Sequence, residues 1–484
     1  MRTVTLGGAL AALLALLAPA LAAAGSAPSK PTGIFGAVEA FRAGALASEA
    51  GLSWQRVSFL WHGLQPNGPN DWNPFYFPDP DLNAELAAGR TIVGLLMSPP
   101  AWANGTGRPA DPPRNFALAP DDPHNLWTAY VSRVVSTYRG RIDTWLIWNE
   151  PDIWDPTFPI YSWSGSVTDY YRLVKRAYLA AKAVNPNVTI ALGGQTYWWD
   201  KKYNRELFFK RFLDVAAGDE TAPANGYYFD AVVLHLYNDP ASLYEVPVYY
   251  KQLLAAYGID KPIWINETNV VPHDDPQSPL PRSDYRVTMD EQASYIIQAV
   301  ANALAAGVER IGFYKMRDDP EYPRGAEPYG LVSANGVPKP AYHAVKTAVK
   351  FLEGAGPATR SVEKGVVRVT FSKPGTRTTV LWNMTPAPAV YTLPAAAGEA
   401  QLVDKLGRTR AIRPQGGAYF IELPPATANT VPGEPTTYLV GGSPMIVVES
   451  GLRNAAAPAS ARSWSGQLLA YGLDEPDIPS SNVR

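Results

Sequence analysis

The 484-residue sequence contains no cysteine. Without thiols the chain forms no disulfide bond and offers no cysteine ligand for a structural zinc site. A lipid-modified cysteine behind an N-terminal export segment is excluded as well. The fold must therefore be stabilised by a hydrophobic core, and the hydrophobic content of 46% allows a sizeable one.

An excess of charge of one sign is also missing. Charged residues make up 18% of the chain, and the formal net charge is −2. Because no basic stripe or charged tail occurs, we expect no nucleic-acid partner. The five histidines, at positions 62, 124, 235, 273 and 343, lack the spacing of metal ligands. No glycine-rich phosphate loop precedes a Lys-Ser/Thr pair, so we expect neither a metal nor a cofactor.

Long hydrophobic runs are confined to the N-terminus. Arg2 precedes an apolar run over residues 6–17, and small residues at 20–22 or 22–24 offer a cleavage site. This pattern predicts a signal peptide over residues 1–24 and a secreted protein, extracellular or periplasmic. A membrane anchor is the alternative, but the apolar run is short for a bilayer span. We therefore expect no stable membrane span after cleavage.

Between residues 25 and 352, short and nearly continuous apolar runs alternate with helical segments. Strands with such runs are buried on both faces, which indicates a parallel sheet covered by helices. Eight strand–helix units predict an α/β fold, a closed (β/α)8 TIM barrel. The predicted strands begin near Gly33 and then cover Trp54–Leu60, Thr91–Met97, Thr144–Trp148, Val188–Leu192, Phe229–Leu236, Pro262–Glu267 and Arg310–Tyr314.

Between residues 353 and 450 the pattern changes to short β runs separated by turns such as 373–375 and 416–417. This predicts a small C-terminal antiparallel β-sandwich domain. Residues 451–484 are polar and rich in alanine and serine, which predicts a loosely packed tail. The predicted β runs are Val367–Phe371, Thr378–Trp382, Ala389–Leu393, Ala400–Val403, Tyr419–Leu423 and Thr437–Val440.

Two of the predicted barrel strands end on the dipeptide Asn-Glu. One strand stops at Asn149-Glu150-Pro151, where proline ends the ladder, and another ends at Asn266-Glu267. A single glutamate before proline is more often a solvated turn residue. Two strand-tip glutamates in one barrel are, however, the pair that glycoside hydrolysis requires. One carboxyl group protonates the leaving oxygen, and the other attacks the anomeric carbon.

With these glutamates in their strand settings, the chain resembles the clan A glycoside hydrolases, which are retaining (β/α)8 enzymes. Within the clan it most resembles glycoside hydrolase family 39, from Gly33 into the sandwich. The resemblance implies that Glu150 is the acid/base, that Glu267 is the nucleophile and that Asn149 binds the sugar 2-hydroxyl. The matching motifs are Gly51–Arg56, Trp61, Pro66, Ser98–Trp102, Trp148–Asp152, His235–Tyr237, Asn266–Glu267, Gly330–Val332 and Lys339–Tyr342.

The acid must carry a proton near neutral pH, while the nucleophile must stay ionised and needs donors or a positive neighbour. Arg56 is the candidate neighbour, with a structural ion pair as the alternative. Tyr237 is placed to donate to Glu267. His235 could bind a sugar hydroxyl or the acid/base. Both could equally be satisfied barrel residues.

Aromatic residues are frequent in the strand-tip loops, and aromatic faces stack on sugar rings. Core packing explains any one of them, but we expect at least two of the group to line sugar subsites. At strand eight, Phe313-Tyr314 stands where a tryptophan often forms the floor of the sugar site in the clan. The candidates are Trp102, Trp154, Trp163, Tyr197, Trp198, Trp199 and Tyr314.

The sequence therefore favours a secreted retaining β-glycosidase that acts as a monomer on a polysaccharide or oligosaccharide. The aromatic loops favour endo-action on a polysaccharide. An exo-acting β-xylosidase-like enzyme and a transglycosylase remain alternatives, as does a non-catalytic carbohydrate-binding protein.

Overall fold

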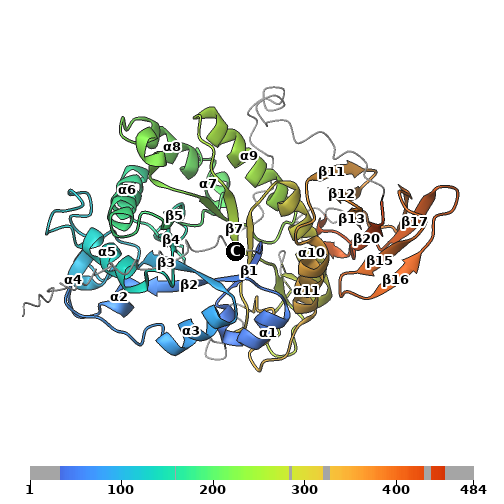
Figure 1. The fold of residues 1–484 in the computed structure, drawn as a ribbon, viewed down its shortest axis with the longest axis horizontal. Helices are drawn as coiled ribbons and strands as arrows, with labels where there is room; N and C mark the ends of the chain where they lie inside the picture. Colours follow the sequence, from blue (N-terminus) through green and yellow to red (C-terminus); the bar gives the residue numbers. More distant parts are fainter. Residues whose placement is uncertain (1–32, 159, 283–285, 320–327, 430–437, 453–484) are drawn as a thin grey trace, which may run out of the picture. The chain divides into compact units, whose positions relative to one another are not determined.

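The computed structural model describes residues 33–158, 160–282, 286–319, 328–429 and 438–452. The predicted signal peptide (1–24) and residues 453–484 of the predicted tail lie outside these ranges. Eight parallel strands form the largest sheet (Figure 1). In spatial order they are β5 (Thr189–Leu192), β4 (Thr144–Ile147), β3 (Thr91–Met97), β2 (Trp54–Leu60), β1 (Phe35–Val38), β10 (Arg310–Phe313), β7 (Ile263–Thr268) and β6 (Val232–His235).

The two ends of this sheet meet. Parallel bridges join Ala191 to Ala231 and Gln195 to Leu234, which connects β5 to β6. The barrel interior is filled by side chains that alternate along the strands with those facing the helices. Since Trp54, Leu146 and Trp264 are buried there, the barrel is a packed core, and the predicted TIM barrel is confirmed.

Helices cover the outside of the barrel (Figure 1). Helix α5 shows why they form: Asn125 accepts a hydrogen bond from the Thr128 backbone at its N-terminus, and Trp127, Val131 and Val134 face the core at helical spacing. The helices are η1 (Ala40–Ala43), α1 (Gly44–Glu49), α2 (Trp61–Leu64), α3 (Asp79–Ala87), α4 (Ala101–Asn104), α5 (Leu126–Tyr138), α6 (Val167–Val184), α7 (Trp198–Lys202), α8 (Phe208–Ala217), η2 (Pro223–Tyr228), α9 (Ser242–Ala256), α10 (Met289–Ala305) and α11 (Pro340–Leu352).

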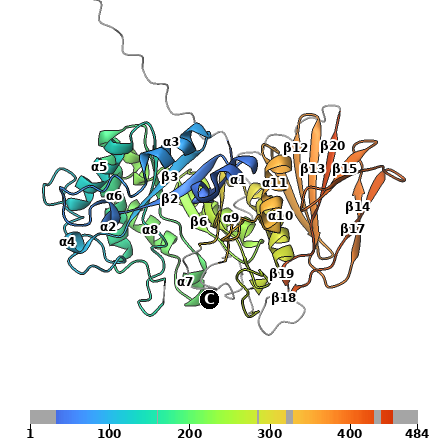
Figure 2. The ribbon, with the colours of Figure 1, turned by 90° about the horizontal axis from the view of Figure 1, so that it is seen from below.

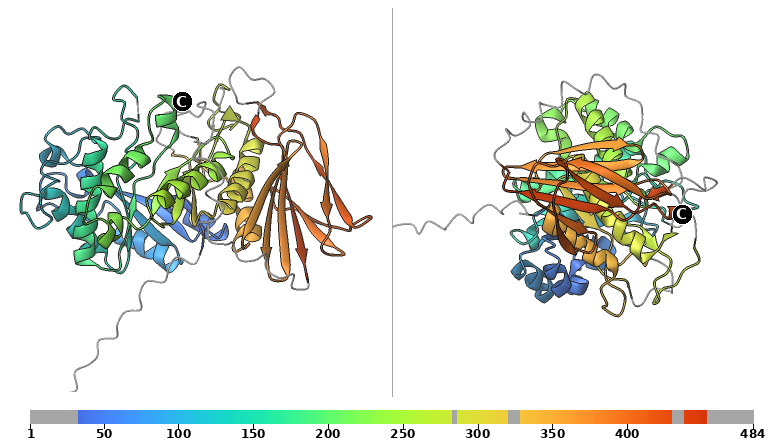
Figure 3. Two further views of the ribbon diagram at one scale, coloured as in Figure 1. Left: turned by 90° about the horizontal axis from the view of Figure 1, so that it is seen from above. Right: turned by 90° about the vertical axis from the view of Figure 1, so that its right-hand side faces the viewer.

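After α11 the chain forms an antiparallel sandwich with two unequal layers (Figure 3). Its larger sheet has, in spatial order, β11 (Ala358–Glu363), β12 (Val366–Lys373), β13 (Thr376–Asn383), β20 (Met445–Ser450), β15 (Ala400–Asp404) and β16 (Thr409–Ile412). The second layer is the pair β14 (Ala389–Pro394) and β17 (Ala418–Leu423). Two short pairings complete the described strands: β8 (Val271–Pro272) with β9 (Arg286–Val287), and β18 (Ala428–Asn429) with β19 (Tyr438–Val440).

The larger sandwich sheet is buried on both faces because successive side chains point to opposite sides. Leu381 and Val447 face β14 and β17. Val380, Trp382 and Ile446 face the other way and join the core that includes the barrel helices. Helix α10 contacts β11, β12, β13 and β19 (Figure 2). The predicted sandwich is therefore confirmed, and it shares its core with the barrel.

Among the described residues, every helix is too short or too polar to cross a lipid bilayer.

Candidate active site

The two strand-tip glutamates meet at one end of the barrel. Glu150 follows β4, and Glu267 lies on β7. One ligand-capable atom from each of Glu150, His235 and Glu267 lies within 4.8 Å of the other two. Strands far apart in the sequence thus bring two carboxylates and an imidazole to one place.

Glu150 is held in an uncommon backbone conformation. Its φ of +47° lies in the left-handed region, which non-glycine residues rarely adopt. The Glu150 amide donates to Gly194 O at 2.8 Å, and the Ser162 hydroxyl donates to the carbonyl of Asn149. These bonds from two other segments fix the turn, so the Glu150 carboxyl group is aimed by the surrounding structure.

Glu267 is aimed by an extra residue in β7. Leu234 of β6 is paired with Ile265, but the next residue, His235, is paired with Glu267. Asn266 is therefore the additional residue of a bulge, and a bulge changes the direction of the side chain that follows it. Glu267 consequently points into the same cavity as Glu150.

The surroundings of Glu267 favour its ionised form. Arg56 forms an ion pair with Glu267 Oε1, and the Tyr237 hydroxyl donates to Oε2. Burial raises the pKa of Glu267, but Arg56, His235 and the Tyr237 hydrogen bond outweigh burial and bring the pKa below its usual value. Arg56 also donates to Asn149 Oδ1 at 3.2 Å, so a single guanidinium orients residues on both sides of the site.

His235 connects the two carboxylates. Its Nδ1 lies 2.7 Å from Glu150 Oε1 and 3.4 Å from Glu267 Oε2. Burial lowers the pKa of His235, but the two carboxylates outweigh burial and raise it. The fully buried imidazole packs against Gly194, where an added Cβ would meet His235 Nε2 at 1.9 Å. Glycine at this position is what allows β5 to approach the ring.

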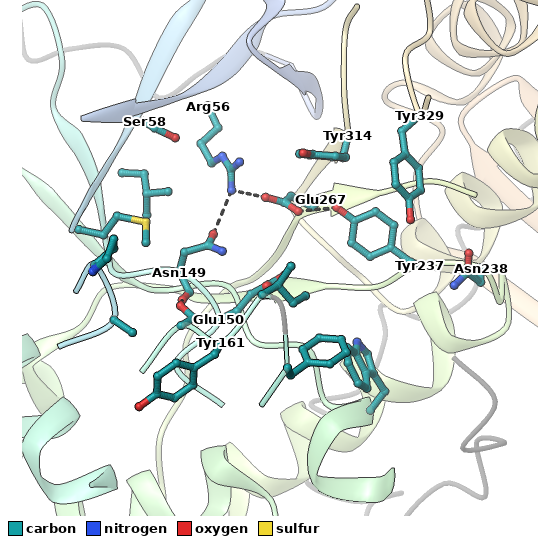
Figure 4. A pocket seen from close by; sticks show the side chains of 18 residues that line it. Arg56, Ser58, Asn149, Glu150, Tyr161, Tyr237, Asn238, Glu267, Tyr314 and Tyr329 are labelled. Atoms are coloured by element: carbon teal, nitrogen blue, oxygen red, sulfur yellow. Dashed lines mark hydrogen bonds and ion pairs between the residues drawn. The ribbon is translucent and has the colours of Figure 1, made fainter. Parts of the chain in front are cut away.

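A cavity of about 380 Å³ opens above these groups (Figure 4). Three tyrosines that pack edge to face or tilted against one another, with ring centroids 5.5–6.1 Å apart, form one of its walls: Tyr237, Tyr314 and Tyr329. Asn269 holds this wall because its Nδ2 donates to the carbonyls of Tyr314 and Tyr329, both at 2.8 Å. The other lining residues are Arg56, Ser58, Leu95, Met97, Pro109, Ala110, Asn149, Glu150, Phe158, Ile160, Tyr161, Ser162, Trp198, Asn238 and Glu267.

No family model and no curated protein matches the sequence, whereas many solved structures share the fold. A family 39 glycoside hydrolase from Bacteroides cellulosilyticus aligns with a TM-score of 0.64 at 17% identity, over 86% of this chain and 80% of that chain. A family 30 endoxylanase from Clostridium papyrosolvens gives 0.56 at 14% identity over 87% and 97%. A monomeric β-xylosidase from Caulobacter crescentus gives 0.55 at 14% identity over 88% and 97%.

The chain has the fold of these clan A glycoside hydrolases. At such identities the likeness concerns the fold, and the chemistry must be argued from the site itself.

Apart from the seven aromatic candidates, six site residues were predicted from the sequence, and the structure gathers all six around one cavity. Five line it directly, and His235 lies beneath them. Trp198 and Tyr314, two of the seven aromatic candidates, line the cavity as well, and their contact with a sugar remains a prediction. The five that line it directly are Arg56, Asn149, Glu150, Tyr237 and Glu267.

Trp102 and Trp154 lie elsewhere. The indole of Trp102 donates to Gln65 O at 2.9 Å and packs edge-on against Trp61. The Trp154 ring lies under the guanidinium of Arg205, 4.3 Å from its centroid. Both side chains are turned away from the cavity because these partners hold them.

Several cavity residues were not foreseen from the sequence. Tyr329 lies in a loop after β10, far along the chain from Glu150, and nothing in its local sequence indicates that it lines the cavity. Phe158, Ile160 and Tyr161 lie in the loop that begins at Glu150. Their closeness to Glu150 in the sequence was a usable signal, but their direction depends on how the loop folds.

Glu150, His235 and Glu267 could in principle ligate a cation, since their donor atoms are close together. Two of them are already engaged by protein donors, however. Arg56 and Tyr237 occupy both oxygens of Glu267, and His235 Nδ1 is directed at Glu150. The guanidinium supplies the positive charge that a metal would bring, so this donor set fits proton transfer better than metal binding.

Proposed function

We propose that the protein is a retaining glycoside hydrolase in which Glu267 is the nucleophile and Glu150 is the acid/base. The observation that carries the proposal is the spacing of the two carboxylates, whose nearest ligand-capable oxygens lie within 4.8 Å. Retaining enzymes have carboxyl groups about 5 Å apart, while inverting enzymes need a larger gap for a water molecule.

The unequal surroundings of the carboxylates support this division of roles. Glu267 has a lowered pKa and accepts from Arg56 and Tyr237, so it is ionised and ready to attack. Glu150 has the imidazole of His235 as its side-chain partner. A proton shared between Glu150 Oε1 and His235 Nδ1 is available to a leaving group.

In the first step Glu267 forms a bond to the anomeric carbon while the glycosidic C–O bond breaks. Glu150 gives its proton to the departing oxygen, and an alcohol leaves. Asn149 is placed to bind the sugar 2-hydroxyl, a contact that strengthens as the transition state forms. Arg56 contacts both Asn149 and Glu267. One side chain therefore orients the nucleophile and the residue that would bind the sugar 2-hydroxyl.

In the second step water replaces the alcohol. Glu150, now ionised, accepts a proton from this water. At the same time the water oxygen bonds to the anomeric carbon, and the ester bond between that carbon and Glu267 breaks. The net reaction is addition of water across the glycosidic bond, and both inversions at the anomeric carbon cancel.

The cavity volume bears on the mode of action. At about 380 Å³ it lies near the small end of the roughly 300–1,000 Å³ range of ligand sites. A small cavity supports the exo-acting alternative, in which a terminal sugar is released, over endo-action within a polysaccharide. The sugar in the cavity would be the terminal residue of an oligosaccharide or the sugar of another β-linked glycoside. The signal-like segment over residues 1–24 supports export of the enzyme.

The proposal is tested by incubating the purified chain with β-linked oligosaccharides, polysaccharides and aryl β-glycosides. Products are identified by mass spectrometry, and NMR records the configuration of the first sugar released. We expect a β product at early times. Glu267→Gln should abolish turnover, because the amide cannot form the ester. An α product at early times would contradict the retaining mechanism, and turnover by Glu267→Gln would contradict the nucleophile.

The same experiment separates the modes of action. Release of monosaccharide alone supports exo-action, while a ladder of oligosaccharides supports endo-action. Glu150→Ala is the control for the acid/base. In this variant Glu267 should still be glycosylated by aryl glycosides whose phenol is acidic, because such a leaving group needs no proton. Added azide should restore turnover, because azide attacks the glycosyl-enzyme in place of water without needing a base.

A further inference from the structure

Four lining residues of the cavity with aromatic or aliphatic side chains come from the segments that follow β4 and β5. Phe158, Ile160 and Tyr161 come from the connection between β4 and α6, and Trp198 comes from the start of α7. The side chain of Ile160 is 50% exposed at this edge. We name Phe158, Ile160, Tyr161 and Trp198 the apolar rim.

The apolar rim is built into the structure. Phe158 packs against Trp199 with ring centroids 4.4 Å apart and against Trp198 at 6.2 Å. The Tyr161 amide donates to Phe158 O at 3.0 Å, and the Phe158 amide donates to Asp155 O at 3.1 Å. These contacts tie Phe158 to Asp155, to Tyr161 and to the start of α7.

The position of the rim relative to the glutamates tells which part of a substrate it would meet. This step rests on the proposed function. Because Glu150 protonates the leaving oxygen, the leaving group lies on the Glu150 side of the anomeric carbon. Figure 4 shows Tyr161 beyond Glu150, on the side away from Glu267. Because Phe158 and Ile160 stand in the same connection as Tyr161, and Trp198 packs on Phe158, we place the rim beside the space that the leaving group occupies.

The chemistry of the rim differs from that of the opposite side. Around Glu267 the cavity offers Arg56, Asn149 and the Tyr237 hydroxyl, which suit the hydroxyl groups of a bound sugar. A second sugar on the rim would bring further hydroxyls, and each would lose water without gaining a partner from Phe158 or Ile160. Ile160 also lacks an aromatic face on which a sugar could stack.

We propose that the leaving group of the natural substrate is an apolar alcohol, alkyl or aryl, attached to a single β-linked sugar. Phe158, Ile160 and Trp198 take up its carbon skeleton as water leaves them.

The test uses alkyl β-glycosides with methyl, butyl and hexyl leaving groups on the sugar that is cleaved fastest from aryl β-glycosides. Simple alkanols of this series have similar leaving abilities, so chain length reports contact with the rim. Burying one methylene changes an equilibrium constant about fourfold. We expect kcat/KM to rise at least about tenfold from methyl to hexyl, and the hexyl glycoside to exceed the disaccharide with the same terminal sugar.

Ile160→Ser should reduce the ratio of hexyl to methyl kcat/KM several-fold. Val362→Ser is the matched control, since Val362 is a similarly exposed aliphatic side chain, 54% exposed, on strand β11 of the sandwich. That variant should keep the wild-type ratio. Hydrolysis with no dependence on chain length, or a preference for the disaccharide, would contradict the proposal of an apolar leaving group but not the proposed glycosidase activity. Absence of hydrolysis with every glycoside would overturn both.

Discussion

His235 is the residue whose protonation links the two halves of the proposed reaction. Its imidazole contacts Glu150 and approaches Glu267, so it affects acid and nucleophile in different ways. Toward Glu150 it shares a proton. Toward Glu267 it contributes positive charge, which lowers the pKa of that carboxyl group.

We predict that His235→Asn narrows the pH profile of kcat/KM from both sides. The asparagine amide can still donate toward Glu150 but cannot hold a titrating proton, so the alkaline limb moves to lower pH. Loss of the imidazolium charge raises the pKa of Glu267, so the acid limb moves to higher pH. The measurement is kcat/KM on an aryl β-glycoside between pH 3 and 10.

Tyr237→Phe is the comparison for this prediction. It removes one hydrogen bond to Glu267 and no contact to Glu150. Its acid limb should move to higher pH while its alkaline limb stays in place. If His235→Asn lowers the rate equally at all pH values, the imidazole serves only to pack the site.

At the residue level the sequence indicated most of what surrounds the glutamates, because those residues stand at strand tips. Arg56, His235 and Tyr237 belong to strand motifs whose direction the barrel determines. Trp102 lies in the short helix α4 and Trp154 in a loop, and their contacts with Trp61 and Arg205 come from elsewhere in the chain. Loop direction depends on such tertiary contacts and is not encoded in the local sequence.

Among the elements, the end of β5 determines how closely β6 can approach. Strand β5 is followed by Gly193-Gly194, and His235 at the end of β6 packs on Gly194. The carbonyl of the same glycine accepts from the Glu150 amide. One short segment therefore positions both the acid and its histidine partner.

We predict that Gly194→Ala lowers kcat about a hundredfold or more, since a displacement near 1 Å at a reacting group costs on this order. The added Cβ would meet His235 Nε2 at 1.9 Å, and the imidazole must move. KM should change far less. Gly398→Ala is the control, since its Cβ meets no atom within 4 Å. Near-normal kcat in a folded Gly194→Ala protein, judged by circular dichroism, would contradict the role of this contact.

The elements also show where sequence patterns suffice. The eight barrel strands were predicted because strands buried on both faces have continuous apolar runs. Strands β11 and β16 were missed: they are the outer strands of their sheet, and their exposed sequences carry little apolar signal. Strand β20 was missed as well although it has an apolar run, and its place between β13 and β15 arises from long-range pairing.

At the scale of the whole molecule, helix α10 unites barrel and sandwich. The buried side chain of Gln298 donates to the carbonyls of Gly441 and Gly442 at 3.0 and 3.1 Å and accepts from the Gly441 amide at 3.0 Å. Lys405 reaches from the sandwich to Asp290 at 2.7 Å and to Ser294 at 2.9 Å. With one hydrophobic core across the junction, the two parts should unfold together.

We therefore predict that Gln298→Leu destabilises the whole protein by about 2–4 kcal/mol, because it leaves the buried amide of Gly441 and two carbonyls without partners. Urea unfolding followed by circular dichroism and by tryptophan fluorescence should show a single transition, moved to lower urea by the same amount in both signals. Gln401→Leu, at an exposed position of β15, should stay within about 0.5 kcal/mol of the parent. Two separate transitions, with only one moved by Gln298→Leu, would mean that the barrel folds independently and that the sandwich is an attachment to it.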